Sequence, residues 1–249
     1  MTNQIQNTSP ILYAKLAGLA YLILIICGLF SELYVRGNLI VDGNASATAT
    51  NILANTSLFR IGFMSDLVML ICDVIVGVLL YILLRPVSKT LAILALAFRL
   101  IMNAILGINL LTHFYVLILL SDASYLSAFS TEQLHGFVSV YLEAHSIGYA
   151  IGLIYFALHC FFLGILIYKS QLFPKILGFL LVAASFSYLI DSSAIFILPD
   201  YRTENYPYIM LPALIAELSL CFWLLFRGTK DNHTNDPALQ SRNTQSHVK

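Results

Sequence analysis

The sequence predicts an all-α integral membrane protein, built as a polytopic bundle of six transmembrane helices. Hydrophobic residues make up 59% of its 249 residues, charged residues only 10%, and the mean hydropathy is +0.84. Soluble domains are about 45–50% apolar and about 25% charged, so both values are typical of a membrane protein. Six segments also reach the length of about 20 apolar residues that a helix needs to cross a hydrocarbon layer about 30 Å thick.

The six predicted helices follow one another along a single membrane domain, residues 11–227. Each is bounded by charged residues, proline or turn residues, and they cover residues 11–35, 59–84, 90–120, 134–168, 173–198 and 207–226. Residues 1–10 form a short N-terminal tail that lacks the positive charge of a signal peptide, so we expect the first helix to be retained. Residues 228–249 are polar without a hydrophobic period, which predicts a disordered cytoplasmic tail.

The fourth helix and the loop after the first helix have features of their own. Ser130 or Thr131 is suited to cap the fourth helix, and Glu132 lies in its first turn. This helix is longer than the bilayer is thick, so we expect it to tilt or to extend beyond the membrane. In the loop after the first helix, the stretch "ATATNILAN" predicts one short helix.

The basic residues predict that both termini are cytoplasmic. Short loops rich in lysine and arginine stay on the cytoplasmic side of a membrane. The opposite side has only Arg36, Arg202 and, at the mouth of a helix, Arg60. The residues that set the orientation follow the second, fourth and sixth helices and are Arg85, Lys89, Lys169, Lys175, Arg227 and Lys230.

Charge and cysteine content exclude several classes of protein. The net charge is zero and no basic tract is present, so the lipid bilayer is an expected partner and nucleic acid is not. The four cysteines lie singly within apolar segments, without a C-x-x-C pair. This pattern argues against a disulfide framework or a structural zinc site and favours small buried hydrophobic side chains.

Ionisable residues within the predicted spans are the candidates for function. An Asp or Arg at the centre of a membrane helix costs about 2.5–3.5 kcal/mol even on a favourable insertion scale, so such residues face the interior of the bundle. Asn103 and Asn109 accompany them. The ionisable residues are Glu32, Asp66, Asp73, Glu143, Asp191, Glu217, Arg99, Arg60 near a helix mouth, His113, His145 and His159.

Helical spacing assigns several of these residues to common faces. Asp66 and Asp73 are two turns apart on one helix. His145 and His159 are about four turns apart, and Gly148 and Gly152 on the same face form a small-xxx-small pattern that favours close helix packing. We therefore expect this face to point into the bundle.

Two groups of polar residues follow from the expected depth of each residue. Asp73 and Arg99 fall near the middle of the membrane, which predicts a buried ion pair between them. The outer half holds a second group, which predicts an outward-facing acidic and histidine-containing pocket. Its residues are Glu32, Asp66, His113, Glu143, His145 and Asp191.

Three kinds of function are open at this point. Six acids against two arginines leave carboxylates that must be protonated, reach water or hold a cation, which favours binding or passage of a cation, a proton or a small polar solute. A membrane-embedded enzyme is an alternative, because His113 and His145 with Asp66, Glu143 or Asp191 offer zinc ligands, and the two histidines suit axial ligation of haem. The cofactor is unknown. A structural or partner-binding protein, whose polar core only specifies packing, is the third reading.

The sequence also resembles the domain-of-unknown-function 4386 family of bacterial membrane proteins. The resemblance is carried by the blocks "SELYVRGNLIVDGNASATATNI", "RIGFMSDLVMLICDVIVGVLLYILLRPVSKTLA", "FRLIMNAILGINLL" and "LPALIAELSLCFWLL", in this order. It covers nearly all of residues 11–227 and implies a six-helix integral membrane protein of the bacterial inner membrane. The resemblance implies no reaction and assigns no catalytic residue.

Overall fold

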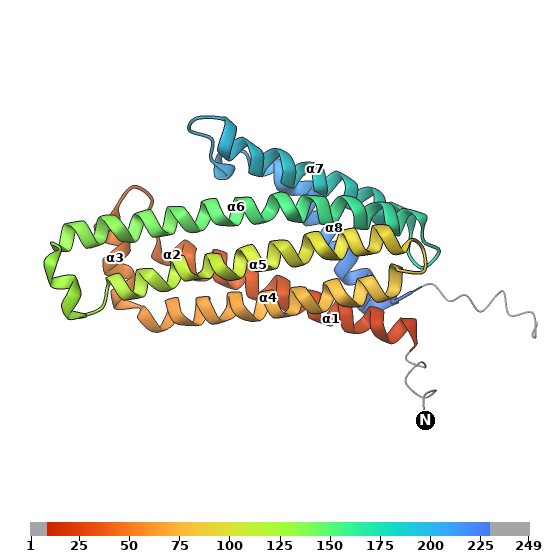
Figure 1. Ribbon diagram of the computed structural model, residues 1–249, viewed down its shortest axis with the longest axis horizontal. Helices are drawn as coiled ribbons and strands as arrows, with labels where there is room; N and C mark the ends of the chain where they lie inside the picture. The colour runs from red at the N-terminus through yellow and green to blue at the C-terminus, as the bar shows by residue number, and fades with distance from the viewer. Residues whose placement is uncertain (1–8, 230–249) are drawn as a thin grey trace, which may run out of the picture.

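A computed structural model describes residues 9–229 of the chain as an elongated bundle of helices (Figure 1). Within these residues there is no strand, and six helices are long and apolar enough to cross a membrane. This confirms the predicted fold class. Most of both predicted tails, residues 1–8 and 230–249, lies outside the described residues.

The six spans are assembled from the following elements. The first span consists of α1 (Pro10–Leu29), a π-helical segment (Phe30–Arg36) and α2 (Gly37–Leu39). The next four spans are α4 (Thr56–Leu84), α5 (Lys89–Leu119), α6 (Thr131–Lys169) and α7 (Lys175–Ile197). The sixth consists of a 3-10 turn (Pro207–Met210), α8 (Leu211–Phe222) and a π-helical segment (Trp223–Arg227). The short helix predicted in the first loop is present as α3 (Ala45–Ala54).

Two of these elements begin or end differently from the prediction. The first span continues to Leu39 instead of ending at residue 35, through a π-helical segment and a short helix that includes Gly37 and Asn38. Arg36 therefore lies on the helix and not in the following loop. α6 begins at Thr131, where Ser130 and Gln133 form a reciprocal capping box, and this confirms Ser130 as its N-cap.

The long helices form a closed ring in chain order. Each packs against its neighbours in the sequence, and α8 with the segment after it packs back against α1. α3 lies at one end of the ring, where it contacts α2, α4 and α6. The interior of the ring holds a large hydrophobic core, and a second, smaller hydrophobic cluster lies under α3.

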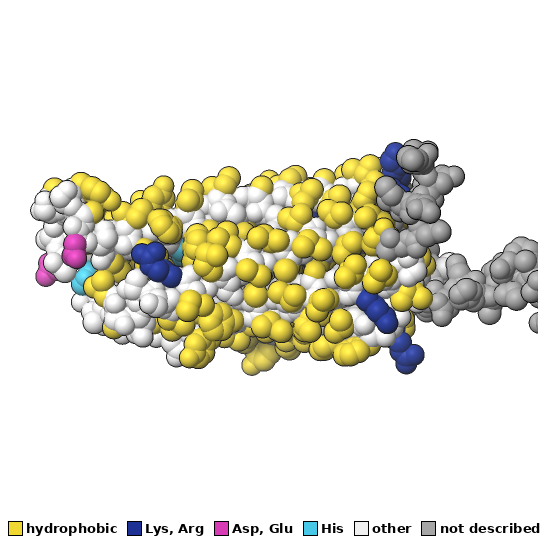
Figure 2. All heavy atoms as spheres, turned by 90° about the horizontal axis from the view of Figure 1, so that it is seen from below, with side chains coloured by type: hydrophobic (Ala, Val, Ile, Leu, Met, Phe, Trp, Pro, Cys, Tyr) yellow, Lys and Arg dark blue, Asp and Glu magenta, His cyan; other side chains and the backbone are white. Residues whose placement is uncertain are grey.

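The two ends of the ring differ in charge. The loops that carry Arg85, Lys89, Lys169 and Lys175 and the segment that ends at Arg227 share the end where the described chain begins and stops (Figure 1). We call it the inner end, because it is the end predicted to face the cytoplasm. Between the two ends, apolar side chains cover much of the face seen in Figure 2. This surface fits a protein surrounded by lipid.

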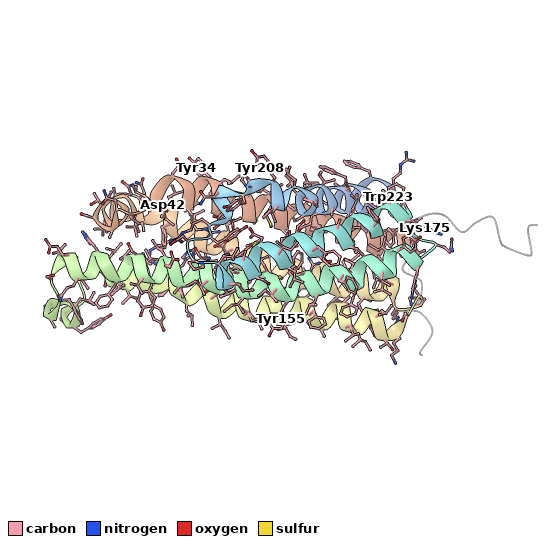
Figure 3. All side chains as sticks on the ribbon, turned by 90° about the horizontal axis from the view of Figure 1, so that it is seen from above. Tyr34, Asp42, Tyr155, Lys175, Tyr208 and Trp223 are labelled. Carbon is pink, nitrogen blue, oxygen red and sulfur yellow. The ribbon has the colours of Figure 1, made fainter. Side chains whose placement is uncertain are left out.

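Helix lengths and aromatic side chains give the approximate membrane level. α6 has 39 residues, so it is about 58 Å long and extends well beyond a hydrocarbon layer of about 30 Å. Tyr34 and Tyr208 are exposed by 57% and 77% and lie on the outside of the bundle, away from Lys175 and Trp223 (Figure 3). Because exposed tyrosines gather at membrane–water boundaries, we expect these two to mark the outer one.

Candidate functional site

The buried polar side chains of the bundle occupy two layers at different heights. Measured along the helices at about 1.5 Å per residue, His113 and His145 lie about 36 Å from the inner ends of α5 and α6. We call this the outer layer, and it includes Arg36, Asp66 and Asn109. Arg99, His159 and Glu217 lie about 15 Å from the inner ends of α5, α6 and the last span, near the middle of a hydrocarbon layer about 30 Å thick. We call this the midplane layer, and it includes Asp73 and Asn103.

Arg36 organises one side of the outer layer. Its Nη1 donates to Asp66 Oδ2 at 2.7 Å and to Ser31 Oγ at 2.9 Å, and its Nε donates to Glu32 Oε2 at 2.7 Å. Arg36 and Asp66 are buried, whereas the side chain of Glu32 is 65% exposed. Ser31 Oγ in turn donates to the carbonyl of Gly62 at 3.2 Å, which ties the π-helical segment to α4.

A pair of stacked histidines forms the other side of the outer layer. The rings of His113 on α5 and His145 on α6 have centroids 3.6 Å apart and an interplanar angle of 15°. The rings of Phe59 on α4 and His113 pack edge to face, with centroids 5.5 Å apart. Asn109 Nδ2 donates to the carbonyl of His145 at 2.8 Å, and Thr112 Oγ1 lies 3.2 Å from His145 Nδ1. The pair is thus held by contacts from three helices.

The histidine pair and the arginine cluster belong to one layer. Val35, next to Arg36, packs in the same small hydrophobic cluster as Phe59, whose ring contacts His113. The first span, α4, α5 and α6 therefore each contribute a buried polar side chain at this height. Two imidazoles stacked with centroids 3.6 Å apart favour the neutral form, because two positive charges would repel each other at this separation.

One atom of this layer lacks a partner. His113 Nε2 is buried and makes no hydrogen bond to any described residue. A buried polar atom without a partner is uncommon and calls for an explanation such as a bound molecule. Among the fully buried polar side-chain atoms of the outer layer, this nitrogen is the one without a hydrogen-bond partner in the described part of the chain, and Asn103 Oδ1 is its counterpart in the midplane layer. We therefore call His113 Nε2 the open position of the outer layer.

Apolar side chains close the outer layer from both sides. The small hydrophobic cluster under α3 includes Phe59, Val116 and Leu142, which lie within one turn of the histidines along their helices or in contact with them. Toward the midplane, Leu106 and Leu110 belong to the large core. The layer is therefore occluded in this conformation, and α3 with its cluster covers its outer side.

Glu143 and Asp191 do not join this layer, although the sequence places them at its depth. Glu143 is two residues from His145, so the two side chains leave α6 in different directions. Glu143 is exposed and pairs with Arg202 Nη1 at 3.1 Å. Asp191 is on α7, which α6 separates from α5 in the ring, and its carboxylate accepts from Tyr201 Oη at 2.7 Å and Thr203 Oγ1 at 3.0 Å. These two acids attach the connection between α7 and α8, and expected depth alone wrongly grouped them with the pocket.

Tyr201, one of the residues that attach this connection to α7, lies outside the spans and has a shifted pKa. Burial, followed by the hydrogen bond to Asp191, raises the pKa of the Tyr201 phenol to about 12. Tyr201 also stacks on Tyr206, with ring centroids 5.2 Å apart. The hydrogen bond from the Tyr201 hydroxyl to Asp191 therefore helps to hold the loop against α7.

The structure brings Asp73 and Arg99 into contact in the midplane layer. Arg99 Nη2 lies 2.6 Å from Asp73 Oδ1 and Arg99 Nε lies 2.9 Å from Asp73 Oδ2, so the pair is bidentate. Asn103 Nδ2 donates to the same carboxylate. Both charged residues are almost completely buried. Gly77 makes the space for this pair, because a Cβ there would lie 3.0 Å from Arg99 Cδ.

His159 completes the environment of Arg99. Arg99 Nη1 donates to His159 Nε2 at 2.8 Å, so this nitrogen must be the acceptor and Nδ1 carries the proton. His159 Nδ1 then donates to the carbonyl of Ala95 at 2.8 Å. The aromatic rings of Tyr21 and Phe156 lie 5.7 and 5.5 Å from the guanidinium carbon. His145 and His159 both face α5, as do Gly148 and Gly152, which confirms the predicted inward face of α6.

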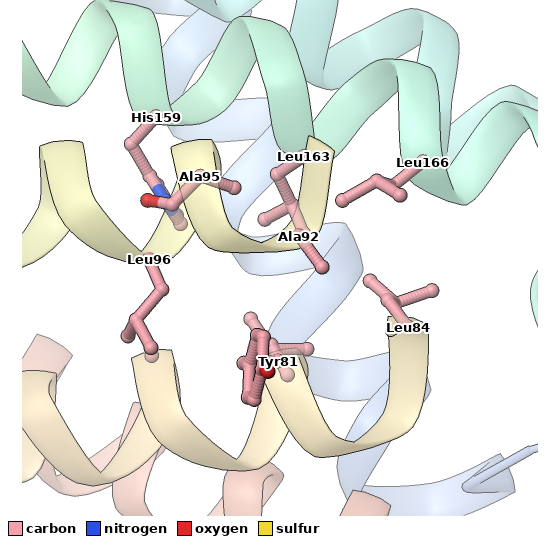
Figure 4. A pocket seen from close by; sticks show the side chains of 10 residues that line it. Tyr81, Leu84, Ala92, Ala95, Leu96, His159, Leu163 and Leu166 are labelled. Atoms are coloured by element: carbon pink, nitrogen blue, oxygen red, sulfur yellow. The ribbon is translucent and has the colours of Figure 1, made fainter. Parts of the chain in front are cut away.

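A narrow crevice of about 10 Å³ leads from the inner end toward the midplane layer (Figure 4). It lies between α4, α5 and α6, begins near Leu84 and Leu166, and ends at His159. Its walls are mostly apolar, and its one histidine is already bonded at both nitrogens. The outer layer, with its open nitrogen, is therefore the better candidate for binding.

The predicted charge excess is smaller than the sequence indicated. Arg36 and Arg202 were assigned to outer loops, yet Arg36 pairs with Glu32 and Asp66, and Arg202 pairs with Glu143. Asp191 and Glu217 are held by hydroxyl groups instead. The spacing of Glu32 and Arg36 by four residues was the available signal for an intrahelical pair. Nothing in the sequence singled out Tyr188, Tyr201 or Thr203.

The geometry does not assemble the metal or haem ligands considered from the sequence. Among the described residues, no group of three His, Cys, Asp or Glu side chains is placed to hold a metal ion. Axial ligation of haem requires two imidazoles on opposite faces of the macrocycle, whereas the rings of His113 and His145 stack directly on each other. In this arrangement neither group fits between them.

Comparison with known proteins assigns the chain to a family. Residues 16–228 match the family described as domain of unknown function DUF4386. The chain belongs to this family. One relative is an uncharacterised protein of Archaeoglobus fulgidus, which is 34% identical over 162 residues, or 65% of this chain and 80% of the relative. No solved structure matches the chain.

Proposed function

We propose that this DUF4386 protein binds a small polar solute in the outer layer of its bundle, next to Arg36 and the stacked histidines. The observation that carries the proposal is the unpartnered, buried Nε2 of His113. A solute with hydrogen-bond donors and acceptors would supply the missing partner, because a neutral imidazole nitrogen either donates or accepts one bond.

The charges around the layer favour a polar solute over a bare metal cation. Asp66, the buried acid at this height, is already neutralised by Arg36 at 2.7 Å. Among the described residues, no group of three His, Cys, Asp or Glu side chains is placed to coordinate a metal ion. A polar solute needs only hydrogen-bonding groups such as the open nitrogen of His113.

The proposal includes a route and an orientation. The outer layer lies at the height of the exposed Tyr34, so it is close to the outer membrane–water boundary. α3 and the cluster around Phe59 cover it from that side. A solute would enter from outside when this cover moves, and both termini would lie in the cytoplasm, in a bacterial inner membrane.

A purely structural role is the second candidate, and one observation favours it. Almost every acid within the spans has a partner within the protein, as expected for residues that specify helix packing. The open nitrogen of His113 is the observation in the outer layer that speaks against a purely structural role. A variant at this position therefore discriminates between them.

The experiment compares thermal unfolding of purified protein in detergent with and without three probes: ammonium chloride, glycerol and sodium acetate. A bound solute stabilises the folded state in proportion to its occupancy. At least one probe is expected to raise the Tm of the wild type and to leave the Tm of His113→Phe unchanged, because Phe keeps the ring and removes Nε2. His135→Phe, a change on α6 outside the layer, should respond as the wild type does. Equal responses of all three proteins, or none, would support the structural reading.

A further inference from the structure

We infer that Glu217 of α8 is a proton-binding site at the midplane of the membrane, where its carboxyl group holds a proton that exchanges with water. Glu217 lies about 15 Å from the inner end of the last span, at the same height as Arg99 and His159. The site uses other residues than the outer layer, so it does not depend on the proposed solute.

The carboxyl group of Glu217 is held by a phenol hydroxyl. Tyr188 on α7 donates its hydroxyl to Glu217 Oε1. Hydroxyl partners serve a protonated carboxyl as well as a carboxylate, because a phenol both donates and accepts. The arrangement therefore orients the group without requiring it to be charged.

The nearby cation is already committed to another acid. Arg99 makes two side-chain bonds to Asp73 and one to His159 Nε2. His159 accepts from Arg99 and is therefore neutral, so it provides no positive charge for Glu217. Arg99 and Asp73 together are neutral, and an ionised Glu217 would leave a net negative charge in the hydrocarbon layer. The protonated carboxyl avoids that charge.

No ion pair of the described residues includes Glu217. Its side-chain hydrogen bond comes from the Tyr188 hydroxyl, which carries no charge. A carboxylate at this position would therefore lack a counter-ion of its own.

The experiment is infrared spectroscopy of the protein in lipid at neutral pH, in the region where a protonated carboxyl group absorbs. The wild type should show a carboxyl C=O band that shifts on transfer to heavy water, because the proton exchanges. The band should disappear in Glu217→Gln and persist in Asp73→Asn, since Asp73 is ionised. Tyr188→Phe should move the band to higher frequency, because the carbonyl loses its donor.

Isotope labelling keeps the test valid if a variant fails to fold. Wild-type protein with isotope-labelled glutamate carboxyls should show a shifted band, and labelled aspartate should leave it in place. Three results would each overturn the inference: the absence of a protonated-carboxyl band in the wild type, a band that shifts with aspartate labelling, or a band whose frequency is unchanged in heavy water.

Discussion

At the residue scale, the strongest contacts of this protein are those of two buried arginines. Arg36 and Arg99 each hold a carboxylate at 2.6–2.7 Å inside the bundle. Removing one partner of a buried ion pair leaves an uncompensated charge, which is more costly than never having had the pair. Both pairs therefore fix the relative position of the helices that carry them.

The Asp73–Arg99 pair gives a direct prediction about stability. Asp73→Asn should lower the free energy of unfolding in detergent by about 3–5 kcal/mol, because Arg99 loses its counter-ion. Adding Arg99→Met should restore part of that loss, since the unpaired charge is removed. Thermal or denaturant unfolding of the single and double variants measures the coupling. Strictly additive effects would show that the two residues do not interact.

Tyr201 predicts a pH-dependent loop attachment. Its pKa of about 12 lies above the value of about 10 for an exposed tyrosine, so the folded loop retains the proton more strongly than the released loop. The attachment should be complete below about pH 10 and be lost as the pH rises through about 12. Hydrogen exchange of residues 198–206 measures it. Tyr201→Phe should accelerate this exchange already at neutral pH, while exchange in α5 serves as the unaffected reference.

At the element scale, the comparison of sequence and structure turns on the first span. Periodicity and length predicted the helices, the cap at Ser130 and the inward face of α6, because these depend on neighbouring residues. The continuation of the first span through a π-helical segment to Leu39 was not predicted, and with it the burial of Arg36 was missed. Glu143 was misplaced for a related reason, because depth was considered without direction around α6.

The contact between α6 and α7 offers a test at this scale. A Cβ at Gly178 would lie 2.6 Å from the carbonyl oxygen of Gly164 and from the backbone nitrogen of Tyr168. Gly178→Ala should therefore destabilise the protein by about 1–3 kcal/mol through overpacking. Gly136 on α6 has open space around it, so Gly136→Ala should be neutral or stabilising by about 0.5–1 kcal/mol. The free energies of unfolding of both variants in detergent test this prediction. A smaller loss for Gly178→Ala than for Gly136→Ala would contradict the close packing of α6 and α7.

At the scale of the whole molecule, the sequence predicted the six-helix membrane bundle but not which polar residues meet in it. Hydrophobic length alone decides the number of spans, whereas the contacts between Arg36 and Asp66 or His113 and His145 join side chains of different helices. Tyr188 likewise joins α7 to Glu217 of α8, and Cys221 of α8 contacts the carbonyl of Gly18 on α1 where the ring closes. Such contacts follow from helix order and rotation, which local patterns do not encode.

The orientation in the membrane is a prediction for the whole chain. The basic residues gathered at the inner end should keep that end in the cytoplasm. Reporter fusions after Arg85 and after Arg227 should therefore read cytoplasmic, and a fusion near Asn44 should read external. A cytoplasmic signal at Asn44 would reverse the bundle and place the outer layer on the wrong side for a solute from outside.

The central claim is that the open nitrogen of His113 receives a solute. Nitrogen NMR of protein with isotope-labelled histidine reports this directly, with His113→Phe used to assign the signal. The account predicts a neutral His113 whose Nε2 resonance shifts when the stabilising probe, ammonium chloride, glycerol or sodium acetate, is added, while the resonances of His159 stay fixed by Arg99 and Ala95. The account would be contradicted if the Nε2 chemical shift of His113 stayed unchanged with every probe, or changed only when that of His159 also changed.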